Sequence, residues 1–81
     1  MSDTPQVTIY SADWCGFCQA AKQYLDRAGV KFSEKNVDEK REYAEEAMQK
    51  SGQTGIPVLD INGTIIVGFD RARIDSALKT Y

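Results

Sequence analysis

The chain contains two cysteines, Cys15 and Cys18, which lie close together in the segment Trp14-Cys15-Gly16-Phe17-Cys18. Only a thiolate is nucleophilic, and the free N–H groups and the dipole at the start of a helix favour an anion there. A second thiol one helical turn further along is placed to attack the mixed disulfide formed by the first. A Cys-x-x-Cys pair at a strand-to-helix junction therefore predicts thiol–disulfide exchange.

The order of the two cysteines along the expected helix predicts different roles. Cys15 is expected to be the nucleophile because it lies in the first turn, and Cys18 is expected to be the more buried, resolving thiol. The alternative is a pair of structural thiols or half of a zinc site. Zinc normally takes four ligands, whereas the sequence has no further cysteine and no histidine, so the redox interpretation is favoured and no metal site is predicted.

Composition limits the other possibilities. The 81 residues, of which 42% are hydrophobic, predict one domain spanning residues 1–81 that is held by its core. The formal net charge is −2 and no run of like charge exceeds two residues, so we expect neither a nucleic-acid partner nor a membrane surface. The first six residues lack the apolar core of a signal peptide, which predicts a cytoplasmic protein. In that compartment an isolated cysteine pair is typically catalytic.

The elements around the cysteines follow from hydrophobic periodicity. Residues 7–10 alternate and are rich in β-branched side chains, which predicts a strand. Residues 15–28 carry apolar residues at helical spacing, and Gly29 is placed to end that helix. The face expected to point inward consists of Phe17, Ala21, Leu25 and Ala28. Residues 30–37 form the second predicted strand, and its expected core residues are Val30, Phe32 and Val37.

The second half predicts a helix, a hairpin and a final helix. Asp38 is the expected N-cap of a helix over residues 39–50. The apolar positions of that helix are Tyr43, Ala44, Ala47 and Met48. A loop over residues 51–55 leads to strands 56–61 and 64–67, joined by an Asn62-Gly63 turn of type I′.

Asp70 is the expected N-cap of a last helix over residues 71–79. Its inward residues are Ile74, Ala77 and Leu78. The element order is βαβ followed by αββα, and its first unit should be right-handed and parallel. We therefore expect an α/β fold, with a four-stranded mixed sheet flanked on both faces by three helices.

Three segments together give the chain a resemblance to the thioredoxin-fold superfamily, and within it to glutaredoxin-like proteins. They are the cysteine segment, Ile56-Pro57 at the start of the third strand, and Gly68-Phe69-Asp70 before the last helix. The resemblance covers nearly the whole chain and is nearest to compact bacterial glutaredoxins and NrdH redoxins, which reduce ribonucleotide reductase. It implies a monomeric thioredoxin fold that reduces protein or mixed disulfides. It also implies electrons from glutathione, or from NADPH through thioredoxin reductase, and no bound cofactor.

Some residues depart from the family patterns. Glutathione-using glutaredoxins commonly carry a lysine that meets a glutathione carboxylate where this chain has Ala12, and they have Thr-Val-Pro where it has Gly55-Ile56-Pro57. Thioredoxins usually place a buried aspartate where this chain has Ile9. They also have a proline where it has Phe17. These differences argue against efficient glutathione binding and against a plain thioredoxin.

The resemblance also implies a substrate-binding role for residues around the cysteines. Pro57 is expected to be cis and to face the cysteines, leaving the Ile56 backbone able to pair with a substrate strand; the alternative is a simple strand-entry proline. Trp14 and Phe17 are candidates for an apolar docking surface, with Phe17 partly exposed. Core packing is the alternative for both, and for Trp14 the two interpretations stay open.

The turn formed by Gly68, Phe69 and Asp70 is a further candidate, because backbone N–H groups at a helix N-terminus bind carboxylates. In glutaredoxins the equivalent turn holds the γ-glutamyl end of glutathione. The alternative, with which this role is compatible, is that Asp70 is an N-cap and Gly68 a turn residue.

Two other functions are weighed against disulfide reduction. Cys-Gly-Phe-Cys differs by one residue from the Cys-Gly-Phe-Ser motif of monothiol glutaredoxins, which bridge a [2Fe–2S] cluster in a dimer with glutathione. Ala12 argues against such a cluster carrier. A redox-inactive binding module is the least favoured alternative, since both cysteines are present. The expected partners are disulfide-containing proteins, with ribonucleotide reductase as one candidate.

Overall fold

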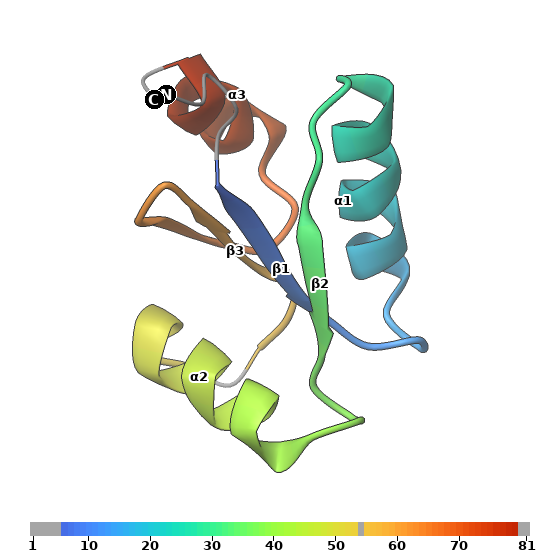
Figure 1. The fold of residues 1–81 in the computed structure, drawn as a ribbon, viewed down its shortest axis with the longest axis vertical. Coiled ribbons are helices and arrows are strands. Elements are labelled where there is room, and N and C mark those ends of the chain that lie inside the picture. Colours follow the sequence, from blue (N-terminus) through green and yellow to red (C-terminus); the bar gives the residue numbers. More distant parts are fainter. Residues whose placement is uncertain (1–5, 54, 80–81) are drawn as a thin grey trace.

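The structure, a computed structural model, describes residues 6–53 and 55–79. Figure 1 shows the predicted order of elements. The elements are β1 (Val7–Ser11), α1 (Gly16–Arg27), β2 (Ser33–Asn36), α2 (Arg41–Ser51), β3 (Val58–Ile61), β4 (Thr64–Val67) and α3 (Arg71–Lys79). Both ends of the expected domain, and Thr54 in the expected loop 51–55, lie outside the described residues. No helix within the described ranges is long and apolar enough to cross a membrane.

The four strands form one mixed sheet in the order β2-β1-β3-β4. β1 pairs in parallel with β2, and the β1–β3 and β3–β4 pairs are antiparallel. α1 and α3 cover one face of the sheet and α2 covers the other (Figure 1). The predicted four-stranded mixed sheet with helices on both faces is therefore confirmed.

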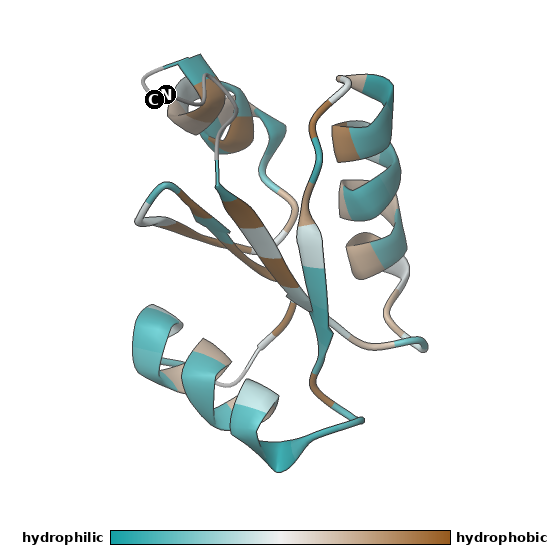
Figure 2. Cartoon of the chain, in the orientation of Figure 1, coloured by the Kyte–Doolittle hydropathy of each residue, from teal (hydrophilic) through white to brown (hydrophobic). Residues whose placement is uncertain are grey.

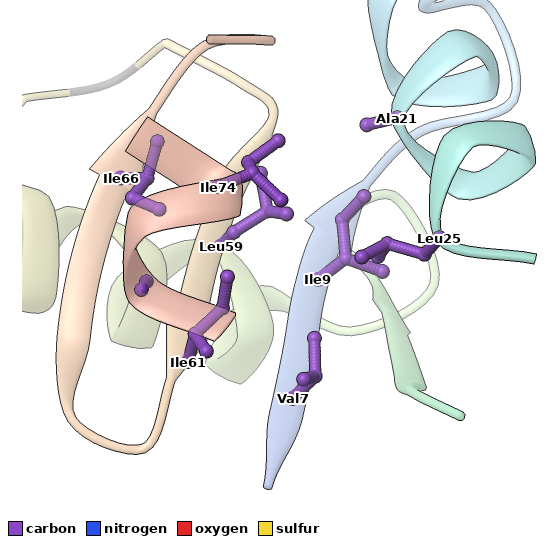
Figure 3. Packing of buried hydrophobic residues seen from close by; sticks show 9 residues of the cluster. Val7, Ile9, Ala21, Leu25, Leu59, Ile61, Ile66 and Ile74 are labelled. Atoms are coloured by element: carbon purple, nitrogen blue, oxygen red, sulfur yellow. The ribbon is translucent and has the colours of Figure 1, made fainter. Parts of the chain in front are cut away.

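The main core lies between the sheet and the pair α1 and α3 (Figure 3). It contains Val7, Ile9, Ala21, Leu25, Leu59, Ile61, Ile66, Ile74 and Ala77. Because side chains alternate along a strand, β1 sends Val7 and Ile9 into this core and turns Tyr10 toward α2, where it meets Ala47 and Val58. Figure 2 shows the result, with hydrophobic colour along β1 and hydrophilic colour on the outer faces of α1 and α2.

The buried stripe of α1 differs from the prediction. It consists of Cys18, Ala21 and Leu25, whereas Phe17 and Ala28 are exposed. Residues at i, i+3 and i+7 define one face of a helix, and Phe17 and Ala28 lie at the edge of that face and at the two ends of the helix. The sheet therefore covers neither of them.

The start of α2 also differs from the prediction. The helix begins at Arg41, its N-cap residue is Lys40, and no side chain caps it. Asp38 was the wrong candidate because its carboxylate instead accepts a hydrogen bond from Trp14. Of the four expected apolar positions, Ala47 is buried and Tyr43 half-buried. The other two, Ala44 and Met48, are exposed, so these apolar positions do not all enter the core.

The remaining elements follow the sequence more closely. β2 is shorter than predicted, and Val30, Phe32 and Val37 flank it as half-buried side chains packed against the cores. β3 begins at Val58, two residues later than expected. The hairpin has positive φ at both Asn62 (52°) and Gly63 (93°), as a type I′ turn requires.

The predicted end of the chain is confirmed in α3. The Arg73 N–H donates to Asp70 Oδ1 over 3.2 Å, so Asp70 caps the helix. The inward residues are those expected, since Ile74 and Ala77 are buried and Leu78 packs against the core.

Candidate active site

The cysteines lie at the junction of β1 and α1, where the sequence places them. Cys15 is the N-cap residue of α1, with an extended backbone (φ −90°, ψ 109°). Its Sγ accepts a hydrogen bond from the backbone N–H of Cys18 over 3.2 Å. The sulfur thus satisfies one of the N–H groups that a helix leaves free in its first turn. Both cysteines are present as free thiols.

The two thiols differ in burial, and burial raises the pKa of the deeper one. Cys15 keeps 7% of its surface exposed, whereas Cys18 has none. Burial, followed by the interaction with the Cys15 side chain, raises the pKa of Cys18 to about 12. At neutral pH Cys18 is therefore a protonated thiol, and solvent reaches the cysteine pair at Cys15.

Three separate segments enclose the thiols. Ala12 is buried with the two cysteines, and Val37 and Ile56 pack against them as half-buried side chains. The nearest lysine on α1, Lys22, binds Glu34 through a 2.7 Å ion pair. Glu34 also accepts a hydrogen bond from Ser11, and Lys22 and Ser11 together lower the pKa of its carboxyl. The cysteines therefore lie in a mainly apolar environment.

Pro57 lies buried at the start of β3, and the Ile56-Pro57 bond is cis, as expected from the resemblance. The Pro57 carbonyl accepts a hydrogen bond from the Gly68 N–H over 2.8 Å. This bond joins two of the three segments that carry the resemblance. The third segment, which contains the cysteines, contacts them through Ile56, whose side chain packs against the cysteines.

Trp14 and Phe17 flank the cysteines on the surface. Their exposed fractions are 72% and 70%, so core packing is wrong for both. The Trp14 Nε1–H donates to Asp38 Oδ2 over 2.8 Å, and the Asn36 side-chain amide donates to Asp13 over 3.1 Å. These two hydrogen bonds fix the loop before α1 against the end of β2 and the loop that follows it, and the loops before α1 and α2 lie at the same end of the molecule (Figure 1).

A pocket of about 160 Å³ adjoins the cysteine cluster. It is lined by Val37, Ala44, Glu45, Ala47, Met48 and Ile56. Sequence reasoning missed this pocket because it identified Ala44 and Met48 only as apolar positions of the helix and gave them no role in a site. The sequence did contain a signal for it. The helix has several apolar residues, and only one of them, Ala47, is buried against the sheet, so the others were available to line a pocket.

The Gly68-Phe69-Asp70 turn is built partly by packing. Gly68 has a φ of +83°, a conformation that glycine adopts most easily. The Phe69 ring meets Tyr24 edge-on, with ring centroids 5.8 Å apart, and packs against the main core. Phe69 therefore packs on the core and Asp70 caps α3, so both residues make structural contacts in this turn.

No group of three or more metal-ligating side chains comes together within residues 6–53 and 55–79. Around the two thiols the structure places Trp14 and Phe17, which are exposed beside them, and Ile56, which packs against them. This arrangement suits attack by one thiol on a sulfur atom, followed by attack of a second thiol from beneath it.

Comparisons with known proteins agree with this chemistry. The family model of glutaredoxin matches residues 7–66. A glutaredoxin-like 8.6 kDa protein from the rubredoxin operon of Clostridium pasteurianum is 38% identical over 73 residues, which cover 90% of this chain and 97% of that protein.

Two solved structures show the same fold. Glutaredoxin-1 of Archaeoglobus fulgidus superposes with a TM-score of 0.85 at 20% identity, covering 95% of this chain and 89% of that one. The glutaredoxin-like NrdH-redoxin of Escherichia coli, which has a thioredoxin-like activity profile, superposes with a TM-score of 0.77 at 31% identity, covering 88% and 92%. These likenesses support a thiol–disulfide oxidoreductase with a thioredoxin fold. By the extent of the family match and the identity to its relatives, the chain belongs to the glutaredoxin family.

Proposed function

We propose that this protein reduces protein disulfides or mixed disulfides by a dithiol mechanism that uses Cys15 and Cys18. The observation that carries the proposal is the asymmetry of the two thiols. Cys15 reaches solvent at the N-cap of α1, and Cys18 lies buried one turn further on, with its pKa raised to about 12. The Cys15 thiol is thus accessible to a substrate, and the Cys18 thiol stays protonated until the mixed disulfide has formed.

In the first step the Cys15 thiolate attacks one sulfur of the substrate disulfide and expels the other sulfur as a thiolate. Cys18 then loses its proton and attacks Cys15 Sγ, which expels the second substrate sulfur. The substrate gains two electrons and two protons, and the protein keeps a Cys15–Cys18 disulfide. An external donor must supply two electrons to restore the dithiol.

The surroundings of Cys15 are proposed to hold the substrate. Trp14 and Phe17 offer exposed aromatic surface beside the sulfur. Ile56 lies on another side of the cysteines, where its backbone is proposed to pair with an extended substrate segment. The Gly68 turn, which is bonded to the Pro57 carbonyl, is the proposed carboxylate site if glutathione binds.

Glutathione and NADPH with thioredoxin reductase are both proposed as electron sources. Ala12 is fully buried and offers no charge to a glutathione carboxylate. The 31% identity to NrdH-redoxin makes the reductase a candidate donor and ribonucleotide reductase a candidate substrate. We further propose that the protein works as a monomer in the cytoplasm.

The mechanism is tested with Cys15→Ser and Cys18→Ser in a disulfide reduction assay on insulin. We expect Cys15→Ser to abolish reduction. Cys18→Ser should accumulate a covalent mixed disulfide, detectable by mass spectrometry, because the resolving thiol is missing. A Cys15→Ser variant with wild-type activity would refute the proposal. Running the wild type with glutathione, or with NADPH and thioredoxin reductase, identifies the donor by the faster reaction.

A further inference from the structure

The pocket beside the cysteine cluster is apolar and small. Five of its lining residues, Val37, Ala44, Ala47, Met48 and Ile56, are apolar. Its volume of about 160 Å³ is below the roughly 300–1,000 Å³ typical of small-molecule sites. It is close to the roughly 150 Å³ of an engineered apolar cavity that binds benzene. The pocket therefore has room for one large side chain and not for a whole cofactor.

The pocket is continuous with the site of the proposed chemistry. Val37 and Ile56 line the pocket and also pack against Ala12, Cys15 and Cys18. Only Val37 and Ile56 therefore separate the cysteines from a substrate side chain that fills the pocket. This shared wall puts the pocket next to the site where we propose that a substrate binds at Cys15.

The charge at the pocket is negative. Glu45 is the one charged residue among the described residues that line it. Over the described ranges Glu45 takes part in no ion pair, whereas its neighbour Glu46 is paired with Lys35 at 2.8 Å. A basic group of a partner therefore finds an available carboxylate beside the apolar pocket.

We propose that this pocket is a specificity subsite for polypeptide disulfides. It takes a large aliphatic or aromatic side chain next to the reactive cysteine of the substrate, and Glu45 selects a lysine or arginine beside that side chain. The inference rests on the disulfide reduction proposed above. The preferred substrate is then an apolar and basic peptide segment, and an acidic one is disfavoured.

Short blocked peptides, each dimerised through a single cysteine, test the proposal. The cysteine is flanked by Leu and Lys, by Ala and Lys, or by Leu and Glu, each pair in both orders. Pre-reduced protein is mixed with each peptide, and the rate of peptide reduction is measured in a single turnover. In the better order we expect the Leu/Lys peptide to react about tenfold faster than Ala/Lys. The Leu/Lys peptide should also react faster than the Leu/Glu peptide, and this difference in rate should become smaller in high salt.

Two variants locate the effect. Ala44→Phe fills the pocket from an exposed helix position, and we expect it to bring the rates of the Leu and Ala peptides together. Ala72→Phe, at an exposed position of α3, is the matched control and should keep the difference. Glu45→Lys should reverse the preference between Lys and Glu peptides, whereas Asp26→Lys near the end of α1 should not. Circular dichroism checks that each variant is folded.

Failure of the subsite is distinguishable from failure of the chemistry. Reduction of 2-hydroxyethyl disulfide, which has no side chains, reports the chemistry alone. If it is reduced but the peptides react equally, or if Ala44→Phe behaves as wild type, the subsite is refuted. If nothing is reduced, the same peptides with serine in place of cysteine are titrated onto the protein, and NMR chemical shifts report whether they bind at the pocket. A preference for Leu/Lys supports the subsite, and equal binding overturns it.

Discussion

At the scale of single residues, the two cysteines carry different properties although they lie one turn apart. Cys15 sits at an N-cap and accepts the N–H of Cys18, while Cys18 is fully buried in a cluster with Ala12, Val37 and Ile56. Burial disfavours the charged form of an acid, and this is the largest cause of the raised pKa of Cys18. Their chemical difference is therefore set by depth in the protein rather than by residue type.

This difference predicts selective alkylation. At pH 8 iodoacetamide should modify Cys15 at least about a hundredfold faster than Cys18, because only thiolates react and a buried thiol is poorly reached. The Cys18 rate should rise about tenfold per pH unit as long as the protein is folded and the pH is below about 12. Peptide mapping by mass spectrometry measures both rates. Equal labelling at pH 8 would contradict the assignment of roles.

At the scale of elements, two loops from neighbouring strands form the face around Cys15. Trp14 follows β1 and Asp38 follows β2, and since these strands are parallel their ends lie at the same edge of the sheet. The indole is 72% exposed and yet has its N–H satisfied by the Asp38 carboxylate. The hydrogen bond fixes the orientation of the exposed aromatic surface without burying it.

We predict that Asp38→Ala lowers kcat/KM for a peptide disulfide several-fold and leaves the rate with 2-hydroxyethyl disulfide unchanged. The freed Trp14 side chain loses its fixed orientation, which matters only to a substrate that contacts it. Asp38→Asn keeps an acceptor oxygen and is the matched control. Trp14 is the only tryptophan of the chain, so its fluorescence anisotropy reports the change directly. Unchanged anisotropy in Asp38→Ala would count against this role.

At the scale of the whole molecule, the two faces of the sheet have different tasks. α1 and α3 close the main core, with Leu25 and Ile74 fully buried (Figure 3). α2 buries little more than Ala47 and leaves Ala44 and Met48 to line the pocket. The stability of the fold thus rests mainly on one face, and the other face is left free to shape the site.

Leu25→Ala should lower the free energy of unfolding by about 2–5 kcal/mol, since it removes a fully buried side chain from the main core. Met48→Ala, at a side chain that is 45% exposed on α2, should cost much less. Urea denaturation followed by circular dichroism measures both. A cost for Met48→Ala as large as that for Leu25→Ala would show that α2 bears more of the stability than its packing indicates.

Features set by neighbouring residues could be predicted from the sequence. The Asn62-Gly63 turn, the Asp70 cap and the start of a helix at the cysteines each depend on the conformational preferences and hydrogen bonds of a few adjacent residues. The order of the elements follows from hydrophobic periodicity, which records which face of each segment is buried. The cysteine pair and its position at a strand-to-helix junction follow in the same way.

Only the tertiary structure decided what depends on residues far apart in the chain. Asp38 bonds Trp14 instead of capping α2, because parallel pairing brings two loops 24 residues apart within hydrogen-bond distance. Phe17 and Met48 are as apolar as core residues, yet both are exposed in the folded chain. Met48 and Ala44 instead line a pocket together with Ile56. Sequence periodicity gives the direction of a side chain from its own helix, whereas burial depends on what stands opposite it.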